Sequence, residues 1–474
     1  MKKPITAVLI GAGRRGLTIY GDFALKNRNK LKFVAVAEPI ETRRKKFASL
    51  HGILPERCYE NWQDLFNEER LADAAFICTQ DQMHTEPTIQ ALEKGYDILL
   101  EKPMAHTLQE CIKIVKKVEE TGRILGVGHI LRYSNFFSKV HDIVHKGLLG
   151  DIININHREN VMWYHYAHSY IRGPWANEET SSPMILAKCC HDLDLLYWIV
   201  NSMPKKISSF GNLLHFKPEN APKGAPEYCL DGCPAKQDCL YYAPRIYIDI
   251  VPITQMMEKS KNLLLKLLGR LRRKYVNFLT YFSKIVKPLK RLRYYQDFPI
   301  YYLYSGQKED YSDKAKARIL KTNQYGKCVY HCDNNVVDHQ IVNIEFENGV
   351  TANLTMHGFS EQEGRTLRID GTKATLIGEF HVSGETLFFY NHFSGKKKLV
   401  YRNKMSLESG KADEGDSELL DAFIDTLITK NKNQPLTSAR ASLESHLMAF
   451  AAEESRLNEK VIDLEDFRRR AEEF

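Results

Sequence analysis

The sequence predicts an α/β protein that begins with a doubly wound parallel sheet and carries antiparallel hairpins further on. Three observations lead to this fold class. A glycine-rich turn at residues 11–16 joins an apolar run to a helical stretch. Short apolar strands then alternate with helical stretches up to about residue 125. Beyond residue 340, Asn348-Gly349 and Asp370-Gly371 separate runs of alternating apolar and polar residues, as hairpin turns do.

The turn itself reads Gly11-Ala12-Gly13-Arg14-Arg15-Gly16 and follows the apolar run from Ile5 to Ile10. In this setting Gly11 permits a tight turn, Gly13 lets the backbone approach a pyrophosphate, and Gly16 allows close helix-to-strand packing. The helix N-terminus offers free N–H groups to phosphates. The next strand ends in Glu38, where a carboxylate can accept hydrogen bonds from a ribose. These features predict a dinucleotide site.

A length of 474 residues favours two domains, which we place at 1–125 and 126–474, with an insertion at about 217–335. The N-terminal apolar run leads directly into the glycine turn, so we expect no signal peptide and a cytoplasmic location. The net charge of +8 is local, because residues 258–293 contain twelve lysines and arginines against one acid. We therefore expect no nucleic-acid partner.

Polar residues follow two further predicted strands. Thr79-Gln80-Asp81 comes after the run at 71–78, and Glu101-Lys102-Pro103 comes after the run at 96–100. Both lie just beyond the carboxyl ends of strands, where open parallel sheets bind their ligands.

These motifs at these spacings resemble the glucose-fructose oxidoreductase, inositol dehydrogenase and MocA (Gfo/Idh/MocA) family of nicotinamide-dependent oxidoreductases. The resemblance continues in residues 128–133, 191–194 and 451–455. It implies a second α/β domain with a large, mostly antiparallel open sheet, and a substrate held between that domain and the nicotinamide. The hairpins beyond residue 340 support such a sheet independently.

The resemblance also implies a cofactor site and its chemistry. The expected cofactor-binding residues are Gly11, Ala12, Gly13, Arg14, Arg15, Gly16, Glu38, Thr79, Gln80, Asp81, His84, Glu101 and Lys102. We expect NAD, because Glu38 would repel a 2′-phosphate, although Arg43 and Arg44 leave NADP open.

Hydride transfer from an alcohol needs a base and a group that stabilises charge on oxygen. By resemblance these are His191 and Lys102, and Asp194, three residues after His191, is spaced to orient it. Within a helix the same residues could simply cap or pair. Family members often carry an aspartate where this chain has Ala187; the adjacent Lys188 either adds a cation to the site or reaches solvent.

Residues 157–175 are rich in aromatic and polar side chains, which suits a sugar with its apolar faces and its hydroxyls. A tyrosine-rich segment packed for stability is the alternative. The expected substrate-binding residues are Arg132, His168, Tyr170, Arg172, Trp175 and Lys188.

Five cysteines fall in the insertion. Cys229, Cys233 and Cys239, with Cys328 as the fourth ligand and Cys332 as its substitute, predict a structural zinc site. Free thiols and an iron–sulfur cluster are the alternatives.

The segment at 257–295 contains leucines and aromatic residues at helical spacing with basic residues between them. We expect these helices to pack within the protein or a homo-oligomer, with membrane contact as the less favoured alternative. Near the C-terminus, helices are predicted around residues 420–427 and from Thr437 or Ser438 onward.

The sequence thus predicts an NAD(H)-dependent oxidoreductase acting on a hydroxyl or keto carbon of a sugar, cyclitol or amino-sugar derivative. An NAD-dependent glycosidase that works by transient oxidation and elimination is one alternative. A regulator that binds NAD without turnover is another, although it would need neither Lys102 nor His191.

Overall fold

The computed structural model describes residues 3–249, 251–259, 263–274, 313–381, 383–404, 415–430 and 436–472. The chain forms two compact units. The first unit comprises Met1–His141, Ile185–Ile207 and Lys411–Phe474, and the second comprises Asp142–Met184 and Ser208–Gly410. The domain division expected at residue 125 stays a prediction.

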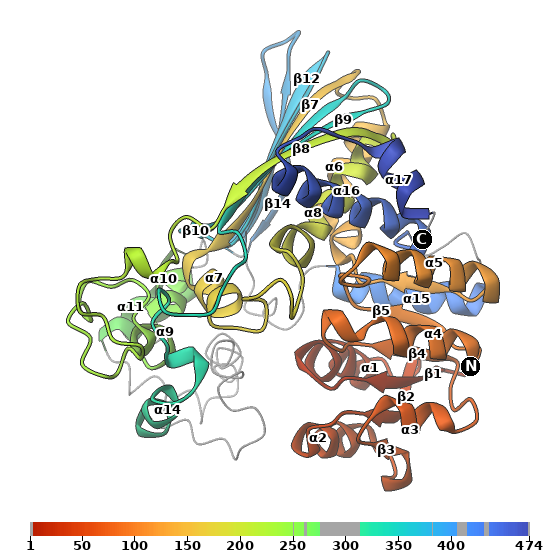
Figure 1. Cartoon of the computed structure of the whole chain (residues 1–474). Coiled ribbons are helices and arrows are strands. Elements are labelled where there is room, and N and C mark those ends of the chain that lie inside the picture. Colours follow the sequence, from red (N-terminus) through yellow and green to blue (C-terminus); the bar gives the residue numbers. More distant parts are fainter. Residues whose placement is uncertain are drawn as a thin grey trace. The chain divides into compact units, whose positions relative to one another are not determined.

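The first unit is built on a six-stranded parallel sheet with the strand order β3-β2-β1-β4-β5-β6. The strands are β1 (Ile5–Ile10), β2 (Leu31–Ala37), β3 (Cys58–Tyr59), β4 (Ala74–Ile77), β5 (Asp97–Leu100) and β6 (Leu125–Val127). The helices between them are a π-helical segment (Arg15–Tyr20), α1 (Gly21–Lys26), α2 (Glu41–His51), α3 (Trp62–Asn67), α4 (Thr85–Glu93) and α5 (Leu108–Thr121). This order confirms the predicted doubly wound sheet (Figure 1). Sheets of this kind generally bind ligands at the carboxyl ends of their strands.

Later parts of the chain complete this unit. They are α8 (Met184–Val200), α15 (Asp416–Thr429), α16 (Ala439–Asn458), β15 (Ile462–Asp463) and α17 (Leu464–Glu472). Helix α16 contacts α5 and β6, and Val127 donates its N–H to the Thr437 carbonyl at 2.8 Å. Ser438 caps α16, as predicted, by accepting from the Ala441 N–H. Helices from the C-terminal part of the sequence therefore pack in the same unit as the parallel sheet.

The second unit is built on a mixed, mostly antiparallel sheet in the order β14-β13-β12-β11-β7-β10-β9-β8 (Figure 1). Its strands are β7 (Ile152–Met162), β8 (Pro204–Asn212), β9 (His339–Phe346), β10 (Thr351–Ser360), β11 (Gly364–Gly371), β12 (Ala374–His381), β13 (Gly384–Asn391) and β14 (Lys397–Lys404). The β7–β10 pair is parallel, and the pairs from β9 to β10 and from β11 to β14 are antiparallel. The predicted antiparallel sheet is confirmed.

Both predicted hairpins are present, with one local difference. Gly349 adopts φ +84 between β9 and β10, as an Asn-Gly turn requires. In the other hairpin Asp370 pairs with Thr375, so the turn lies at residues 371–374, and Gly371 still pairs with Ile152. A Cβ on Gly371 would lie 2.3 Å from the Leu149 carbonyl oxygen, so close packing of a neighbouring segment accounts for this glycine.

The insertion contains short helices: α9 (Ala243–Tyr247), α10 (Val251–Lys259), α11 (Leu263–Lys274) and α14 (Asp313–Leu320). Leu263, Leu267 and Leu271 of α11 are exposed. The second predicted amphipathic stretch, at 275–295, lies outside the described residues. Among the described helices, none has the length and apolar character needed to cross a membrane.

Candidate active site

The glycine turn after β1 leaves room for a ligand at one position. At Gly11, which has φ +89, an added Cβ would lie 2.6 Å from the Cys78 carbonyl oxygen, and at Gly16 it would lie 2.3 Å from the Gly11 carbonyl oxygen. Packing within the chain thus requires both glycines. A Cβ on Gly13 would meet no atom within 4 Å. Gly13 is therefore the position where the missing side chain leaves open space, as a pyrophosphate of a dinucleotide requires.

The carboxylate of Glu38 lies against this turn. It is buried at the end of β2 and accepts the Ala12 N–H at 2.7 Å and the Ile40 N–H at 3.0 Å. Arg44, which the sequence left as a possible phosphate partner, is buried and donates to the Glu38 carbonyl oxygen and to the Glu60 carboxylate at 3.0 Å. Because its guanidinium is used inside the fold, Arg44 gives no support to a 2′-phosphate site.

Arg15 takes part in an ion-pair network behind the turn. Its guanidinium bonds Glu101 at 2.5 Å and Asp416, at the start of α15, at 2.7 Å, and Tyr20 donates its hydroxyl to Glu101. Burial raises the pKa of the Glu101 carboxyl, but Arg15 and the Tyr20 hydrogen bond lower it below its ordinary value. Arg15 and Glu101, both predicted to bind cofactor, thus form an ion pair with each other. The neighbouring Arg14 is half-buried.

The residues after β4 meet the residues after β5. Thr79 donates its hydroxyl to the Met83 carbonyl oxygen, Gln80 precedes the 3-10 turn at Asp81–Met83, and Asp81 is buried. The ring nitrogen Nδ1 of buried His84 lies 2.7 Å from the Pro103 carbonyl oxygen, so Nδ1 donates this hydrogen bond. His84 thereby holds the segment that carries Lys102.

A second histidine holds the same segment from the other end of the sequence. His446, on α16, accepts the Met104 N–H at Nε2 (2.8 Å), and its Nδ1 lies 2.7 Å from the Ser442 carbonyl oxygen. Nε2 must be unprotonated to accept, so Nδ1 carries the proton and the ring is neutral. Burial agrees with this state, because it lowers the pKa of His446 to about 3. The residues 102–104 are thus fixed by His84 at the Pro103 carbonyl and by His446 at the Met104 amide.

Lys102 reaches the first turns of α8. Its Nζ donates to the Ala187 carbonyl oxygen at 2.8 Å. His191 lies four residues after Ala187, so its backbone is one helical turn from the carbonyl group that binds the ammonium. Both side chains are partly accessible. The family's usual aspartate is absent at Ala187, but a backbone carbonyl holds the ammonium there, and half-buried Lys188 follows it.

His129 lies between His191 and His446. Its ring centroid is 5.4 Å from that of His191 and 5.7 Å from that of His446, in edge-to-face arrangements. Burial lowers the pKa of His129 to about 4, so the ring is neutral. Within the described part of the chain, neither of its buried nitrogens has a hydrogen-bond partner. Below, the term histidine cluster denotes His84, His129, His191 and His446.

Asp194 and Arg132 pair with each other. Arg132 donates Nε and Nη2 to the two carboxylate oxygens of Asp194 at 2.7 Å each, and donates Nη1 to the Leu436 carbonyl oxygen at 3.1 Å. Both side chains are almost fully buried. The structure therefore differs from the sequence-based roles: the oxygens of Asp194 bond Arg132 and not His191, and Arg132 is used in the interior. A bidentate guanidinium is the stronger partner for this carboxylate.

In the second unit, the predicted substrate residues lie mainly in the interior. His168 is 3.0 Å from the Tyr247 hydroxyl at Nδ1 and stacks on Tyr325. Tyr170, also buried, stacks on a neighbouring tyrosine, while Trp175 is half-buried. Buried Arg172 donates to the carbonyl oxygens of Lys327 (2.7 Å) and Tyr241 (2.8 Å). Stacking and backbone hydrogen bonds thus involve His168, Tyr170 and Arg172, although Nη1 of Arg172 has no hydrogen-bond partner among the described residues. The substrate-binding role of these residues stays a prediction.

The zinc prediction is not supported. Within the described residues, which include all five cysteines of the insertion, no group of three or more His, Cys, Asp or Glu residues could hold a metal. Cys229 and Cys332 direct their thiols at the carbonyl oxygens of Lys327 (3.8 Å) and Cys328 (3.3 Å). All ten cysteines are free. The assignment of Cys229, Cys233, Cys239 and Cys328 as zinc ligands therefore finds no support among the described residues.

The fold and this geometry agree with the family models. One model, an oxidoreductase family with an NAD-binding Rossmann fold, matches residues 5–129, and its partner, the C-terminal alpha/beta domain of the same oxidoreductase family, matches residues 305–464. The chain belongs to the Gfo/Idh/MocA oxidoreductase family.

Similar proteins from this family share part of the chain. The putative oxidoreductase YteT of Bacillus subtilis is 24% identical over 208 residues, which cover 42% of this chain and 48% of YteT. The 2,7-anhydro-N-acetylneuraminate hydratase of Escherichia coli is 25% identical over 33% of this chain and 41% of that protein. The 1,5-anhydro-D-fructose reductase of Ensifer adhaerens is 31% identical over 28% and 39%, respectively. The chain thus spans less than half the length of these relatives.

Solved structures of the family share the fold over nearly the whole chain. An oxidoreductase from Agrobacterium radiobacter in complex with NAD+, L-tartaric acid and magnesium has a TM-score of 0.64 at 15% identity, covering 98% of this chain and 99% of that one. The WlbA dehydrogenase from Chromobacterium violaceum, in complex with NADH and UDP-GlcNAcA, has a TM-score of 0.59 at 13% identity, covering 98% and 96%.

Sequence reasoning missed the residues that hold the family's lysine in place. Met104 and His446 are 342 residues apart, and Arg15 and Asp416 are 401 residues apart. One signal was available, since His446 lies among Leu443, Leu447 and Phe450 on the predicted buried face of a helix. A histidine on such a face needs hydrogen-bond partners.

Proposed function

We propose that this protein is an NAD(H)-dependent oxidoreductase that transfers a hydride between the nicotinamide and a hydroxyl or keto carbon of a sugar, cyclitol or amino-sugar derivative. The observation that carries the proposal is the placement of Lys102 on the Ala187 carbonyl, one helical turn from His191. An ammonium beside an imidazole provides the two groups that alcohol oxidation requires.

Each residue has a distinct role in this proposal. Lys102 donates a hydrogen bond to the oxygen on the reacting carbon and stabilises negative charge there. His191 accepts the hydroxyl proton at its imidazole. The backbone of residues 11–16 holds the pyrophosphate, and Glu38 holds the adenosine ribose in place of its contact with the Ala12 N–H. When bound, NAD supplies the hydride acceptor.

NAD is favoured over NADP for two reasons. The Glu38 carboxylate would repel a 2′-phosphate, and Arg44 bonds the Glu38 carbonyl and Glu60. We expect a lower Kd for NADH than for NADPH, measured by quenching of protein fluorescence. Equal affinities would refute the assignment of Glu38.

A panel assay tests the reaction. Purified protein is mixed with NAD and, separately, with neutral sugars, cyclitols, amino sugars and aryl glycosides, and both NADH absorbance and released aglycone are recorded. Substrate-dependent NADH formation that is lost in Lys102→Ala and in His191→Ala supports the proposal. Equal rates in wild type and both variants would contradict it.

A second candidate is a reaction without net redox change, in which transient oxidation of the sugar allows elimination or hydration. Two observations favour this second candidate. The chain is partly similar to a 2,7-anhydro-N-acetylneuraminate hydratase, and it has Ala187 in place of an aspartate. Release of aglycone, or consumption of an anhydro-sugar, at constant NADH absorbance would displace the dehydrogenase proposal. A regulator without turnover is indicated instead if Gly13→Val abolishes biological activity while Lys102→Ala and His191→Ala retain it.

We further propose a cytoplasmic homo-oligomer whose partner is a small carbohydrate. Light scattering coupled to size exclusion measures the oligomeric state. A monomer over the working concentration range would refute it.

A further inference from the structure

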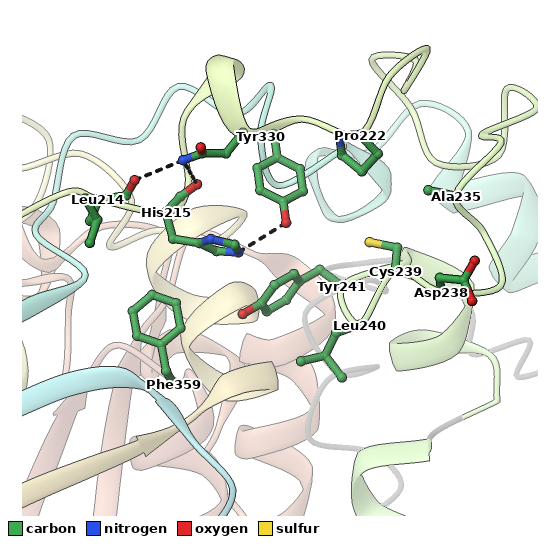
Figure 2. Close-up of a pocket in the computed structure, with 11 residues that line it drawn as sticks. Leu214, His215, Pro222, Ala235, Asp238, Cys239, Leu240, Tyr241, Tyr330 and Phe359 are labelled. Carbon is green, nitrogen blue, oxygen red and sulfur yellow. Dashed lines mark hydrogen bonds between the residues drawn. The ribbon is translucent and has the colours of Figure 1, made fainter.

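The second unit contains a cavity that the proposed chemistry does not use. It has a volume of about 850 Å³, within the range of roughly 300–1,000 Å³ typical of ligand pockets. Figure 2 shows its walls, with the rings of His215, Tyr330 and Tyr241 close together at the centre. The lining residues are Leu214, His215, Asn220, Pro222, Ala235, Asp238, Cys239, Leu240, Tyr241, Tyr330 and Phe359.

The cavity wall is fixed before any ligand binds. Fully buried Asp338 accepts the N–H groups of Leu214 at 2.9 Å and His215 at 2.7 Å. Phe216, which follows His215 in the chain, is buried and stacks on Phe359, with ring centroids 5.6 Å apart and ring planes within 5°. These contacts hold the His215 ring and the Phe359 ring in place, so ordering them costs little on binding.

Aromatic faces and unused polar atoms occur side by side in this cavity. The Tyr330 hydroxyl lies 3.1 Å from His215 Nε2 (Figure 2). Within the described residues, His215 Nδ1 and the Tyr241 hydroxyl make no hydrogen bond. Burial raises the pKa of Tyr330 to about 12 and also raises that of Tyr241, so both phenols remain neutral hydroxyls near pH 7. Phe359 is 41% exposed, which leaves a ring face available for contact.

The charge of the lining limits the ligand class. No lysine or arginine occurs among the lining residues that the structure describes, and Asp238 is the single acid. Phosphate and carboxylate groups would therefore lack a cation to pair with. A purely apolar ligand would remove water from His215 and the tyrosine hydroxyls without replacing their hydrogen bonds. A neutral, polyhydroxylated ring with apolar C–H faces satisfies both surfaces.

Most of this wall lies outside the two family-model matches. Residues 214–241 fall between the match that ends at residue 129 and the match that begins at residue 305, whereas Tyr330 and Phe359 belong to the matched part. The cavity therefore forms where the insertion meets the sheet that the family shares. Such additions commonly alter what a shared fold recognises.

We propose that this cavity is a binding site for one neutral pyranose ring of a saccharide, with the ring face on Phe359 and the hydroxyls at His215, Tyr330 and Tyr241. The site goes beyond the proposed oxidoreductase function, because it needs neither cofactor nor hydride transfer. It also implies that the protein binds a second sugar ring of the saccharide, in addition to the ring that reacts.

Saturation-transfer NMR and calorimetry test the site on full-length protein without NAD. The probes are maltose, cellobiose and N,N′-diacetylchitobiose, with glucuronic acid as the acidic comparison. We expect saturable binding of at least one neutral disaccharide and no binding of glucuronic acid at this site. Phe359→Ala removes the ring face, and Ala235→Trp fills the opposite wall; each should weaken binding about tenfold or more.

Matched variants separate this site from the catalytic one. Phe393→Ala, at an exposed phenylalanine that does not line the cavity, should bind like wild type, and so should Lys102→Ala. Near-UV circular dichroism and an unfolding temperature like those of wild type show that Phe359→Ala and Ala235→Trp are folded. The proposal is overturned if no neutral disaccharide binds, if glucuronic acid binds equally well, or if Lys102→Ala abolishes binding that Phe359→Ala retains. Absence of turnover in the panel assay would refute the oxidoreductase function and leave these binding results unaffected.

Discussion

Two parts of the molecule contain similar residue types but use them differently. They are the histidine cluster of the first unit and the aromatic segment at 163–175 of the second unit. In the histidine cluster, the imidazoles of His84 and His446 bond to main-chain atoms beside Lys102, and Lys102 and His191 keep partial exposure. In the aromatic segment, rings stack on rings, and Arg172 is consumed by carbonyl oxygens. The same composition therefore builds a candidate catalytic centre in one place and a packed core in the other.

The difference lies in what the polar atoms bond. When polar side chains fix a backbone segment that carries a partly exposed cation, the cation stays available for a substrate. When polar side chains satisfy interior carbonyls, those donors stabilise the fold, although Nη1 of Arg172 has no hydrogen-bond partner among the described residues. Density of histidine, tyrosine and arginine in a sequence does not separate these two cases.

The largest effect on activity is expected from substitution of Lys102. Lys102→Ala removes the donor to the reacting oxygen and should lower kcat/KM by about 10²–10³-fold, with little change in NADH affinity. Lys113→Ala, at an exposed lysine paired with Glu86, is the control and should keep wild-type activity. If the two variants were equally active, the histidine cluster would be a packing feature like the aromatic segment.

Acid should destabilise the first unit through His129. Its pKa is lowered to about 4 in the folded protein, against about 6.5 in an unfolded chain, so the unfolded state binds the proton more tightly. The contribution is fully present above about pH 6.5 and is lost as the pH falls toward 4, to an extent of about 3 kcal/mol. His129→Phe should flatten the pH dependence of the unfolding free energy over this window, measured by urea titration. An unchanged slope would contradict a neutral, buried His129.

A histidine-to-phenylalanine substitution in each unit compares how the two units use a buried histidine. His446→Phe leaves the Met104 N–H without its acceptor, and His168→Phe leaves the Tyr247 hydroxyl without its partner, so each should cost about 1–3 kcal/mol of stability. We expect only His446→Phe to lower kcat/KM, because only His446 positions the segment that carries Lys102.

A conservative variant checks that interpretation. His446→Gln offers a side-chain carbonyl to the Met104 N–H and should restore part of the lost kcat. Equal activity losses in His446→Phe and His168→Phe, per folded molecule, would show that general destabilisation accounts for both.

The smallest effect is expected at the cysteines. Chelator treatment should leave the unfolding temperature unchanged, and wild type and Cys233→Ser should contain no zinc by elemental analysis, because no metal cluster occurs in the described residues. Stoichiometric zinc in wild type that Cys233→Ser lacks would restore the original cysteine prediction.

Local features of the site were predictable from the sequence, and distant ones were not. Gly11, Gly16 and the strand ending at Glu38 follow from short-range patterns, and the structure places them as expected. Helical spacing predicted that Asp194 orients His191, but Asp194 pairs with Arg132. A guanidinium 62 residues away is a stronger partner for the carboxylate than a neighbouring imidazole. Cysteine spacing predicted a zinc site that the described residues do not support, since spacing carries no information on where each thiol points.

The first unit draws on three separated stretches of the chain, and this has a consequence for synthesis. Residues 142–184 and 208–410, which make up the second unit, leave the ribosome before Asp416 and His446 do. The parallel sheet is translated first, yet Arg15 and the Met104 amide obtain their partners only near the end of translation. Domains usually fold in the order in which they are made. Here the second unit has its complete set of residues first, and a ribosome-bound chain that stops before residue 416 leaves the nucleotide-type fold unfinished.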